Sequence, residues 1–119
     1  MVILAIYNLK GGVGKTAASI NLAYASAKEG FKTLVWDLDP QGSSSFYLGA
    51  KSIVKNEFRK ILNSEMNLTS AIQTTAYENL DVIPADISAR HADILLNEMK
   101  QSKRKLLSLL SELKNEYDI

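Results

Sequence analysis

The sequence predicts an α/β fold in which helices cover both faces of a mostly parallel β-sheet. Three consecutive segments carry this prediction. Residues 2–7 form a continuous apolar run, which is typical of a strand buried on both faces inside a parallel sheet. Residues 16–29 are rich in alanine and are followed by Gly30, a residue that often ends a helix. Residues 32–39 form a second predicted strand, and a strand–helix–strand unit places its strands parallel in one sheet.

The patterns beyond residue 40 are weaker. A serine is placed to cap a short helix that ends near Leu48. Further helical patterns cover residues 53–63 and 68–74, and residues 80–84 form a short third strand. From about residue 88 to residue 114 apolar side chains recur at helical spacing, in one long helix or in two.

The last residues resemble the approach to a further strand, because an apolar residue, Ile119, follows the long helical pattern. We therefore expect residues 1–119 to be the N-terminal part of a single domain that continues beyond them.

The composition excludes several classes of protein. A net charge of +1 makes the chain as a whole a poor electrostatic attractor for nucleic acid or anionic membranes. The absence of cysteine excludes a disulfide framework and a cysteine-held cluster, and it suits a reducing cytoplasm. No run approaches the roughly 18 apolar residues needed to span a bilayer. We therefore expect a cytoplasmic protein that does not enter a membrane.

A glycine-rich loop lies between the first predicted strand and the first predicted helix. It ends on Gly14, Lys15 and Thr16, as the nucleotide-binding pattern G-x-x-x-x-G-K-[ST] does, but Leu9 stands where the pattern has its first glycine. Backbone N–H groups of such a loop can point into one concavity when side chains do not block the approach. Lys15 is placed for the β- and γ-phosphates of a nucleotide, and the Thr16 hydroxyl for magnesium. The alternative is a glycine turn that merely reverses the chain.

Lys10 is a second lysine beside the loop, and on its own it could be an ordinary solvated side chain. The run from Lys10 to Thr16 nevertheless resembles the deviant Walker A motif of the ParA/MinD family of ATPases. In that family the extra lysine reaches the phosphates of the partner subunit in a nucleotide-sandwich dimer, where a cation can offset charge that develops during phosphoryl transfer. By this resemblance the nucleotide-binding residues are Lys10, Gly11, Gly12, Val13, Gly14, Lys15, Thr16 and Ala17.

Asp37 and Asp39 lie at the end of the second predicted strand, two residues apart and therefore expected on the same side. Ligands bind at this end of the strands in open α/β sheets, although Asp-x-Asp-Pro is also a common way to start a turn. Residues 37–42 resemble the D-x-D-P-Q-G segment of the same family. The resemblance implies that Asp39 positions the hydrolytic water and that Asp37 supports it or the magnesium shell. The implied metal set is Thr16, Asp37 and Asp39, and the implied catalytic set is Lys10, Lys15 and Asp39.

Residues 67–72 and 78–85 resemble the partition branch of the family more loosely. The resemblance implies a P-loop NTPase-like, three-layer α/β/α fold and a ParA-type partition ATPase with ATP or ADP and Mg²⁺ as ligands. It also implies an ATP-sandwich homodimer, non-specific DNA binding through regions mostly beyond this chain, a ParB-like centromere-binding partner, and slow hydrolysis that drives plasmid or chromosome segregation.

Two departures from the family pattern affect the expected activity. Ala17 lacks the hydroxyl that commonly bonds the α-phosphate at this position, so we expect nucleotide affinity to be weaker by about 1 kcal/mol. The family's Walker B aspartate is expected beyond Ile119, so we expect the 119-residue chain alone to be inactive.

Two other interpretations remain open. The chain could belong to another deviant-Walker ATPase, such as the type that places the cell-division site. It could also be a catalytically inactive nucleotide-binding or interaction module. The basic cluster at residues 100–105 favours a solvated helix face over a contact with nucleic acid or a partner.

Overall fold

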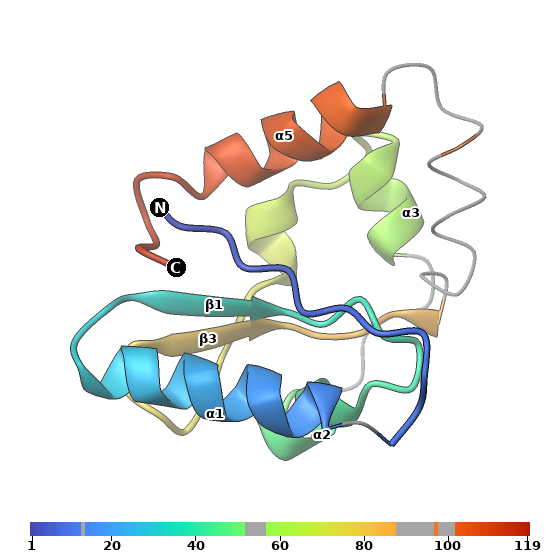
Figure 1. Ribbon diagram of the computed structural model, residues 1–119. Helices are drawn as coiled ribbons and strands as arrows, with labels where there is room; N and C mark the ends of the chain where they lie inside the picture. Colours follow the sequence, from blue (N-terminus) through green and yellow to red (C-terminus); the bar gives the residue numbers. More distant parts are fainter. Residues whose placement is uncertain (13, 52–56, 88–96, 98–101) are drawn as a thin grey trace.

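The computed structural model describes residues 1–12, 14–51, 57–87, 97 and 102–119. A sheet lies between two layers of helices in it, with α1 and α2 on one face and α3, η1 and α5 on the other (Figure 1). The elements are α1 (Lys15–Lys28), β1 (Thr33–Trp36), α2 (Ser43–Tyr47), α3 (Glu57–Leu62), the 3-10 helix η1 (Leu68–Ala71), β2 (Gln73–Thr74), β3 (Leu80–Ile83) and α5 (Ser102–Glu112). The predicted three-layer α/β/α architecture is confirmed.

The described sheet has the strand order β1-β3-β2. β1 and β3 are parallel, with Thr33 opposite Leu80 and Trp36 opposite Ile83. The two-residue strand β2 pairs antiparallel with β3. Because β1 and β3 run in the same direction, the loops that follow them leave the sheet at the same edge.

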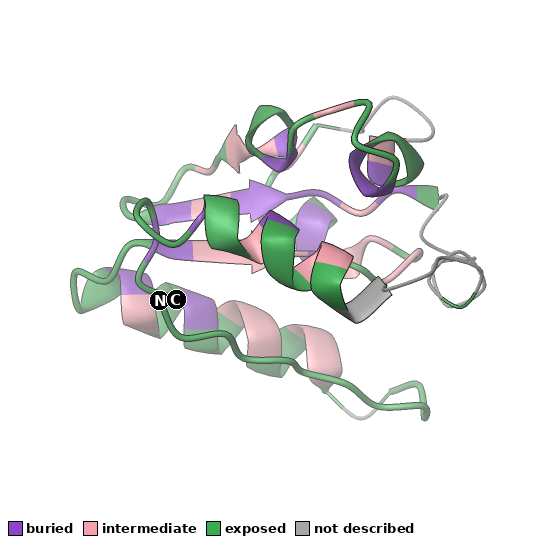
Figure 2. Ribbon diagram, turned by 90° about the horizontal axis from the view of Figure 1, so that it is seen from above, coloured by how far each residue is buried: buried purple, intermediate pink, exposed green. Residues whose placement is uncertain are grey.

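Successive residues of each strand point to opposite faces of the sheet and build two cores. The strands β1 and β3 consist of buried and half-buried residues, purple and pink in Figure 2. On the α1 side, Leu80 and Val82 of β3 pack with α1 residues, and Val35 of β1 packs against them. On the other side, Ile83 lies in a larger cluster with Trp36 packed against it. The remaining fully or largely buried members of that larger cluster are Phe58, Ile61, Leu62, Leu68, Ala71, Leu109, Leu113 and Tyr117.

The predicted strand at residues 2–7 is wrong. This segment forms no strand, and its side chains are exposed, with Val2, Ile3 and Leu4 each more than half exposed. The Val2 N–H donates to the carbonyl oxygen of Asp118 at 2.6 Å, and the Asp118 N–H donates to that of Lys32 at 2.8 Å. Asp118 therefore lies between the N-terminal segment and the edge of β1. An apolar run becomes a strand only where a neighbouring strand offers hydrogen bonds, and residues 3–7 have none within the described chain.

The other predicted elements are present with shifted boundaries. The first helix starts at Lys15 rather than residue 16, and α2 begins after Gly42, whose left-handed backbone (φ 65°) replaces the expected serine cap. The predicted helical pattern at 68–74 divides into η1 and β2, because residues 73–74 pair with β3. The predicted helix at residues 53–63 is described as α3, and the predicted helical region at residues 88–114 is described as α5. The rest of these two patterns, at residues 53–56, 88–96 and 98–101, lies outside the described residues, as does residue 52.

No helix in the described ranges has the length and apolar character needed to cross a membrane.

Tyr117 ties the end of the chain to the sheet. It is 5% exposed, and its hydroxyl donates to Asp81 Oδ2 of β3 at 2.7 Å. Burial, followed by this hydrogen bond to a carboxylate, raises the pKa of the Tyr117 hydroxyl above its ordinary value. The Lys32 ammonium also lies 5.3 Å from the ring centre.

We predict that Tyr117→Phe lowers the free energy of unfolding by about 1 kcal/mol, because it removes a hydrogen bond to a charged acceptor and leaves the ring in place. Urea denaturation followed by circular dichroism measures the change. Tyr77→Phe is the control, since Tyr77 is 46% exposed and its hydroxyl makes no hydrogen bond among the described residues. Equal stability of Tyr117→Phe and the parent chain would contradict the structural role given to the hydroxyl.

Candidate functional site

The glycine loop leads from the N-terminal segment directly into α1. Gly12 (φ 71°) and Gly14 (φ 83°) have left-handed backbones, which glycine adopts without strain. α1 begins straight after Gly14 and has no side-chain cap, so the N–H groups of its first turn point out of the helix end without a side-chain acceptor. A Cβ built on Gly11, Gly12 or Gly14 would meet no atom within 4 Å, so the space in front of the loop is open. An open, uncapped helix N-terminus behind a glycine turn suits an anion.

Lys15, the first residue of α1, forms an ion pair with Asp39, which lies 24 residues further along the chain. Lys15 Nζ donates to Asp39 Oδ2, and both side chains are about one-third exposed. The Asp39 Oδ1 atom accepts the backbone N–H of Gln41 at 3.0 Å. The hydrogen bond from Lys15, and after it the one from Gln41, holds the pKa of the Asp39 carboxyl below its ordinary value. The two predicted motifs therefore meet at one point.

Asp37 behaves differently from Asp39. It is 6% exposed, and its Oδ2 accepts both the N–H and the hydroxyl of Ser45, at 2.8 and 2.7 Å. Its Oδ1 accepts the N–H of Asp39 at 3.1 Å. The expectation that the two aspartates share one side of a strand is wrong, because β1 ends at Trp36 and both residues lie in the loop that follows. Asp37 holds that loop together, and Asp39 faces Lys15.

The remaining predicted residues are placed as follows. Lys10 is exposed, and its backbone N–H donates to Asn8 Oδ1 at 2.9 Å. Thr16 is partly buried at the start of α1, and Ala17 is exposed. Val13 lies outside the described residues, as do Lys100 and Gln101 of the basic cluster.

The donor atoms present fit a magnesium ion that is held mainly by a nucleotide. Within the described chain no group of three or more Asp, Glu, His or Cys side chains could hold a metal by itself. Magnesium bound to a nucleotide, however, needs only one or two protein oxygens besides the phosphates. The Thr16 hydroxyl beside the loop can supply one, and Asp39 lies close enough to Lys15 to face the same ligand.

Ser45 belongs to this site, although it was not among the predicted site residues. Besides its two bonds to Asp37, its Oγ accepts the N–H of Ala85 at 2.8 Å. Ser45 thus joins the loop after β1 to the loop after β3. The sequence shows three successive serines there, which indicated a helix cap, and only the packing of α2 distinguishes Ser45 from Ser43 and Ser44.

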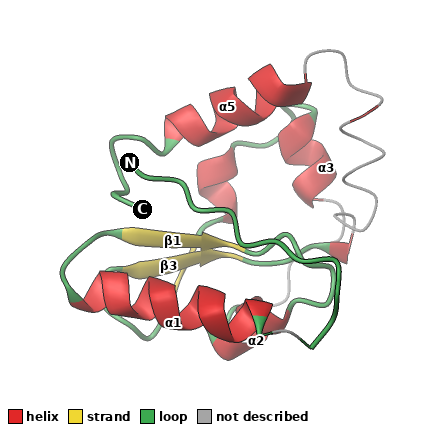
Figure 3. Cartoon of the chain, in the orientation of Figure 1, coloured by secondary structure: helices red, strands yellow, loops and turns green. Residues whose placement is uncertain are grey.

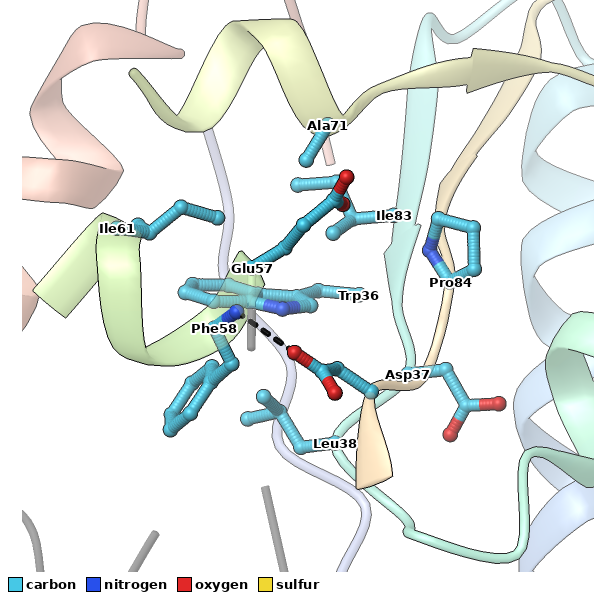
Figure 4. A pocket seen from close by; sticks show the side chains of 10 residues that line it. Trp36, Asp37, Leu38, Glu57, Phe58, Ile61, Ala71, Ile83 and Pro84 are labelled. Carbon is cyan, nitrogen blue, oxygen red and sulfur yellow. Dashed lines mark hydrogen bonds between the residues drawn. The ribbon is translucent and has the colours of Figure 1, made fainter. Parts of the chain in front are cut away.

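A small pocket lies on the opposite side of β1 from α1 (Figure 4). Trp36, Asp37, Glu57 and Phe58 are among the residues that line it. The cavity of about 10 Å³ has at most the room that one water molecule needs. It cannot hold a nucleotide, so we place the functional site at the glycine loop.

Comparison with known proteins identifies the family of this chain. A family model described as an AAA domain matches residues 1–119. The sporulation initiation inhibitor protein Soj of Bacillus subtilis (strain 168) is 40% identical over 117 residues, which are 98% of this chain and 46% of that protein. The chromosome-partitioning ATPase Soj of Treponema pallidum (strain Nichols) is 38% identical over 116 residues, 97% of this chain and 45% of that protein.

The chain belongs to this AAA domain family, as one of its ParA/MinD-type members with a deviant Walker loop. Among solved structures, cobyrinic acid a,c-diamide synthase from Mycobacterium smegmatis with bound ADP and magnesium superposes with a TM-score of 0.81 and 28% identity. That match covers 94% of this chain and 46% of the M. smegmatis protein. The chain spans just under half the length of the ParA/MinD-type relatives that it matches.

Glu57 at the rim of the small pocket makes stability depend on pH. Burial, and after it the nearby charge of Asp86, raises the pKa of the Glu57 carboxyl, with Lys60 acting in the opposite direction. A raised folded-state pKa means that the folded chain holds this proton more tightly than the unfolded chain. The stabilisation from Glu57 is therefore complete below pH 4.5 and is lost as pH rises through the raised pKa.

We predict that Glu57→Gln unfolds at a higher urea concentration than the parent chain at pH 7, because glutamine mimics the neutral acid. The difference should disappear near pH 3.5, where Glu57 is protonated in both states. Glu78→Gln, which neutralises an exposed carboxylate without a side-chain partner among the described residues, is the control. A stabilisation by Glu57→Gln that is the same at both pH values would show that charge at Glu57 is not its source.

Proposed function

We propose that this chain is the nucleotide-binding part of a ParA-type partition ATPase. The observation that carries the proposal is the meeting of Lys15 and Asp39 in front of the uncapped N-terminus of α1. The two residues come from two separate motifs, and each motif resembles the same family. The name of the Treponema pallidum relative, a chromosome-partitioning ATPase, and the ADP and magnesium in the Mycobacterium smegmatis structure support the proposal.

Each residue of the site then has a defined role. The N–H groups from Gly11 to Thr16 bind phosphate oxygens, and Lys15 neutralises the terminal phosphates. The Thr16 hydroxyl holds magnesium, which on binding offsets the negative charge of the β- and γ-phosphates. Asp39 accepts a hydrogen bond from the water that attacks the γ-phosphate. Asp37 positions Asp39, because its Oδ1 accepts the Asp39 N–H at 3.1 Å.

In an ATP-sandwich homodimer, Lys10 of each subunit contacts the phosphates of the nucleotide bound to the partner subunit. Its side chain is exposed and makes no contact with another charged group among the described residues. A free cation beside the loop is available to reach phosphates across a dimer interface, where it would stabilise the charge of the transition state. DNA binding by the dimer and stimulation by a ParB-like protein complete the proposed partition cycle.

We predict that Lys15→Ala abolishes binding of ADP, because Lys15 is the first residue of α1 and supplies a positive charge at its open N-terminus. Isothermal titration calorimetry with ADP and magnesium measures the affinity. Lys28→Ala removes an exposed lysine from the other end of α1 and should bind as the parent chain does. Equal ADP affinity in Lys15→Ala and the parent chain would place the nucleotide elsewhere.

We also predict that Lys10→Ala retains ADP binding but loses ATP-dependent dimerisation. Sedimentation velocity with a non-hydrolysable ATP analogue separates monomer from dimer. Lys51→Ala is the control, since Lys51 is exposed and, among the described residues, only its backbone is hydrogen-bonded, to Gln73. Normal dimerisation of Lys10→Ala would end the assignment of Lys10 to the partner's phosphates.

A further inference from the structure

A continuous chain of hydrogen bonds runs from the loop after β3 to the ion pair at the glycine loop. The Ala85 N–H donates to Ser45 Oγ at 2.8 Å, and the Ser45 hydroxyl donates to Asp37 Oδ2 at 2.7 Å. Asp37 Oδ1 in turn accepts the Asp39 N–H, and Asp39 accepts the ammonium of Lys15. Ser45 is the only described residue whose side chain both donates to Asp37 and accepts from the β3 loop.

The part of this hydrogen-bond network formed by Ser45 and Asp37 is rigid because it is buried. Ser45 is 8% exposed and Asp37 is 6% exposed, and every oxygen of the two side chains has a hydrogen-bond partner. Two further bonds fix the turn itself, since the Gln41 N–H donates to Asp39 Oδ1 at 3.0 Å and the Gly42 N–H donates to the Asp39 carbonyl oxygen at 2.8 Å. A buried, fully satisfied polar network holds its members in one arrangement. Ser45 and Asp37 therefore hold the backbone of Asp39 in place, and the Gln41 N–H orients its carboxylate.

The other end of the network, Asp39 with Lys15, lies at the proposed nucleotide site. The carboxylate of Asp39 is the anion paired with Lys15 in the structure, and a terminal phosphate is the anion that Lys15 binds in the proposed nucleotide complex. The two anions share the single positive charge of this ammonium group and repel each other, so the presence of one weakens the binding of the other. Asp39 thus competes with the phosphate for the Lys15 ammonium. The more firmly the loop holds Asp39 beside Lys15, the more it weakens phosphate binding.

We propose that Ser45 is a positioning residue which, through Asp37, holds Asp39 against Lys15, so that the terminal phosphate of a nucleotide must displace Asp39 before it reaches Lys15. This inference rests on the proposed function of the loop. It gives the segment from Asp37 to Ser45 a regulatory role in ligand binding that is separate from any role of Asp39 in hydrolysis.

The first test needs no nucleotide. Lysine acetylation by an N-hydroxysuccinimide ester, quantified by mass spectrometry, reports how available each amine is, and Lys28 serves as the internal reference. Ser45→Ala and Asp39→Asn should both raise the relative labelling rate of Lys15, whereas Ser45→Thr, which keeps the hydroxyl, should restore the parent rate. Ser44→Ala is the matched control, because Ser44 is 9% exposed in the same helix and makes no side-chain hydrogen bond among the described residues.

The second test measures ADP affinity by calorimetry without magnesium, so that metal ligation does not contribute. Loss of a partly exposed ion pair should tighten ADP binding by about two- to fivefold in Asp39→Asn and in Ser45→Ala. The Ser45 variant changes no charge, so tighter binding there reports the position of Asp39 rather than weaker repulsion. Ser45→Ala added to Asp39→Asn should have no further effect.

The outcomes separate the inference from the proposed function. If the parent chain binds ADP but Ser45→Ala neither tightens binding nor exposes Lys15 to labelling, the positioning role of Ser45 is wrong. If neither the parent chain nor Asp39→Asn binds ADP, the proposed function fails and with it the competition, whatever the labelling shows. If Ser45→Ala does not fold, as judged by circular dichroism, Asp37→Asn weakens the same connection and must expose Lys15 for the inference to stand.

Discussion

The parallel pairing of β1 with β3 is the constraint on which the rest of the structure depends. It brings the loop after Trp36 and the loop after Ile83 to one edge of the sheet, where Ser45 can bond both. It also divides the alternating side chains of the two strands between two cores, one with α1 and one with α3 and α5. A shift of one residue in this register would turn Val82 and Ile83 to the wrong faces.

In the site, an ion pair between Lys15 and Asp39 joins the start of α1 to the loop after β1. α1 packs on the sheet through Ala23 and Ala27, and this packing fixes where its N-terminus and Lys15 lie. The loop after β1 is fixed separately, by the buried carboxylate of Asp37. Because α1 and the loop after β1 are both anchored to the same sheet, Lys15 and Asp39 meet although they lie 24 residues apart in the sequence.

The N-terminal segment is the place where local pattern and tertiary environment disagree. Its apolar residues match a buried strand, yet Asp118 takes the hydrogen-bonding position between Val2 and Lys32. On the same edge of β1, the Leu34 N–H donates to the carbonyl oxygen of Ile119 at 3.0 Å. Hydrophobic pattern reports which residues avoid water, but strand formation also requires a neighbour at the right distance.

The sequence by itself determined the layered α/β class, the boundaries of α1 to within a residue, and the two motifs that meet at the site. Periodicity and glycine placement are local properties, so residues 16–29 and the Gly14-Lys15-Thr16 triplet could be interpreted without the fold. Only the tertiary structure decided that Asp37 is buried while Asp39 faces Lys15, and that Ser45 rather than Ser43 or Ser44 completes the network. These outcomes depend on contacts between residues up to 40 positions apart, and no local pattern encodes them.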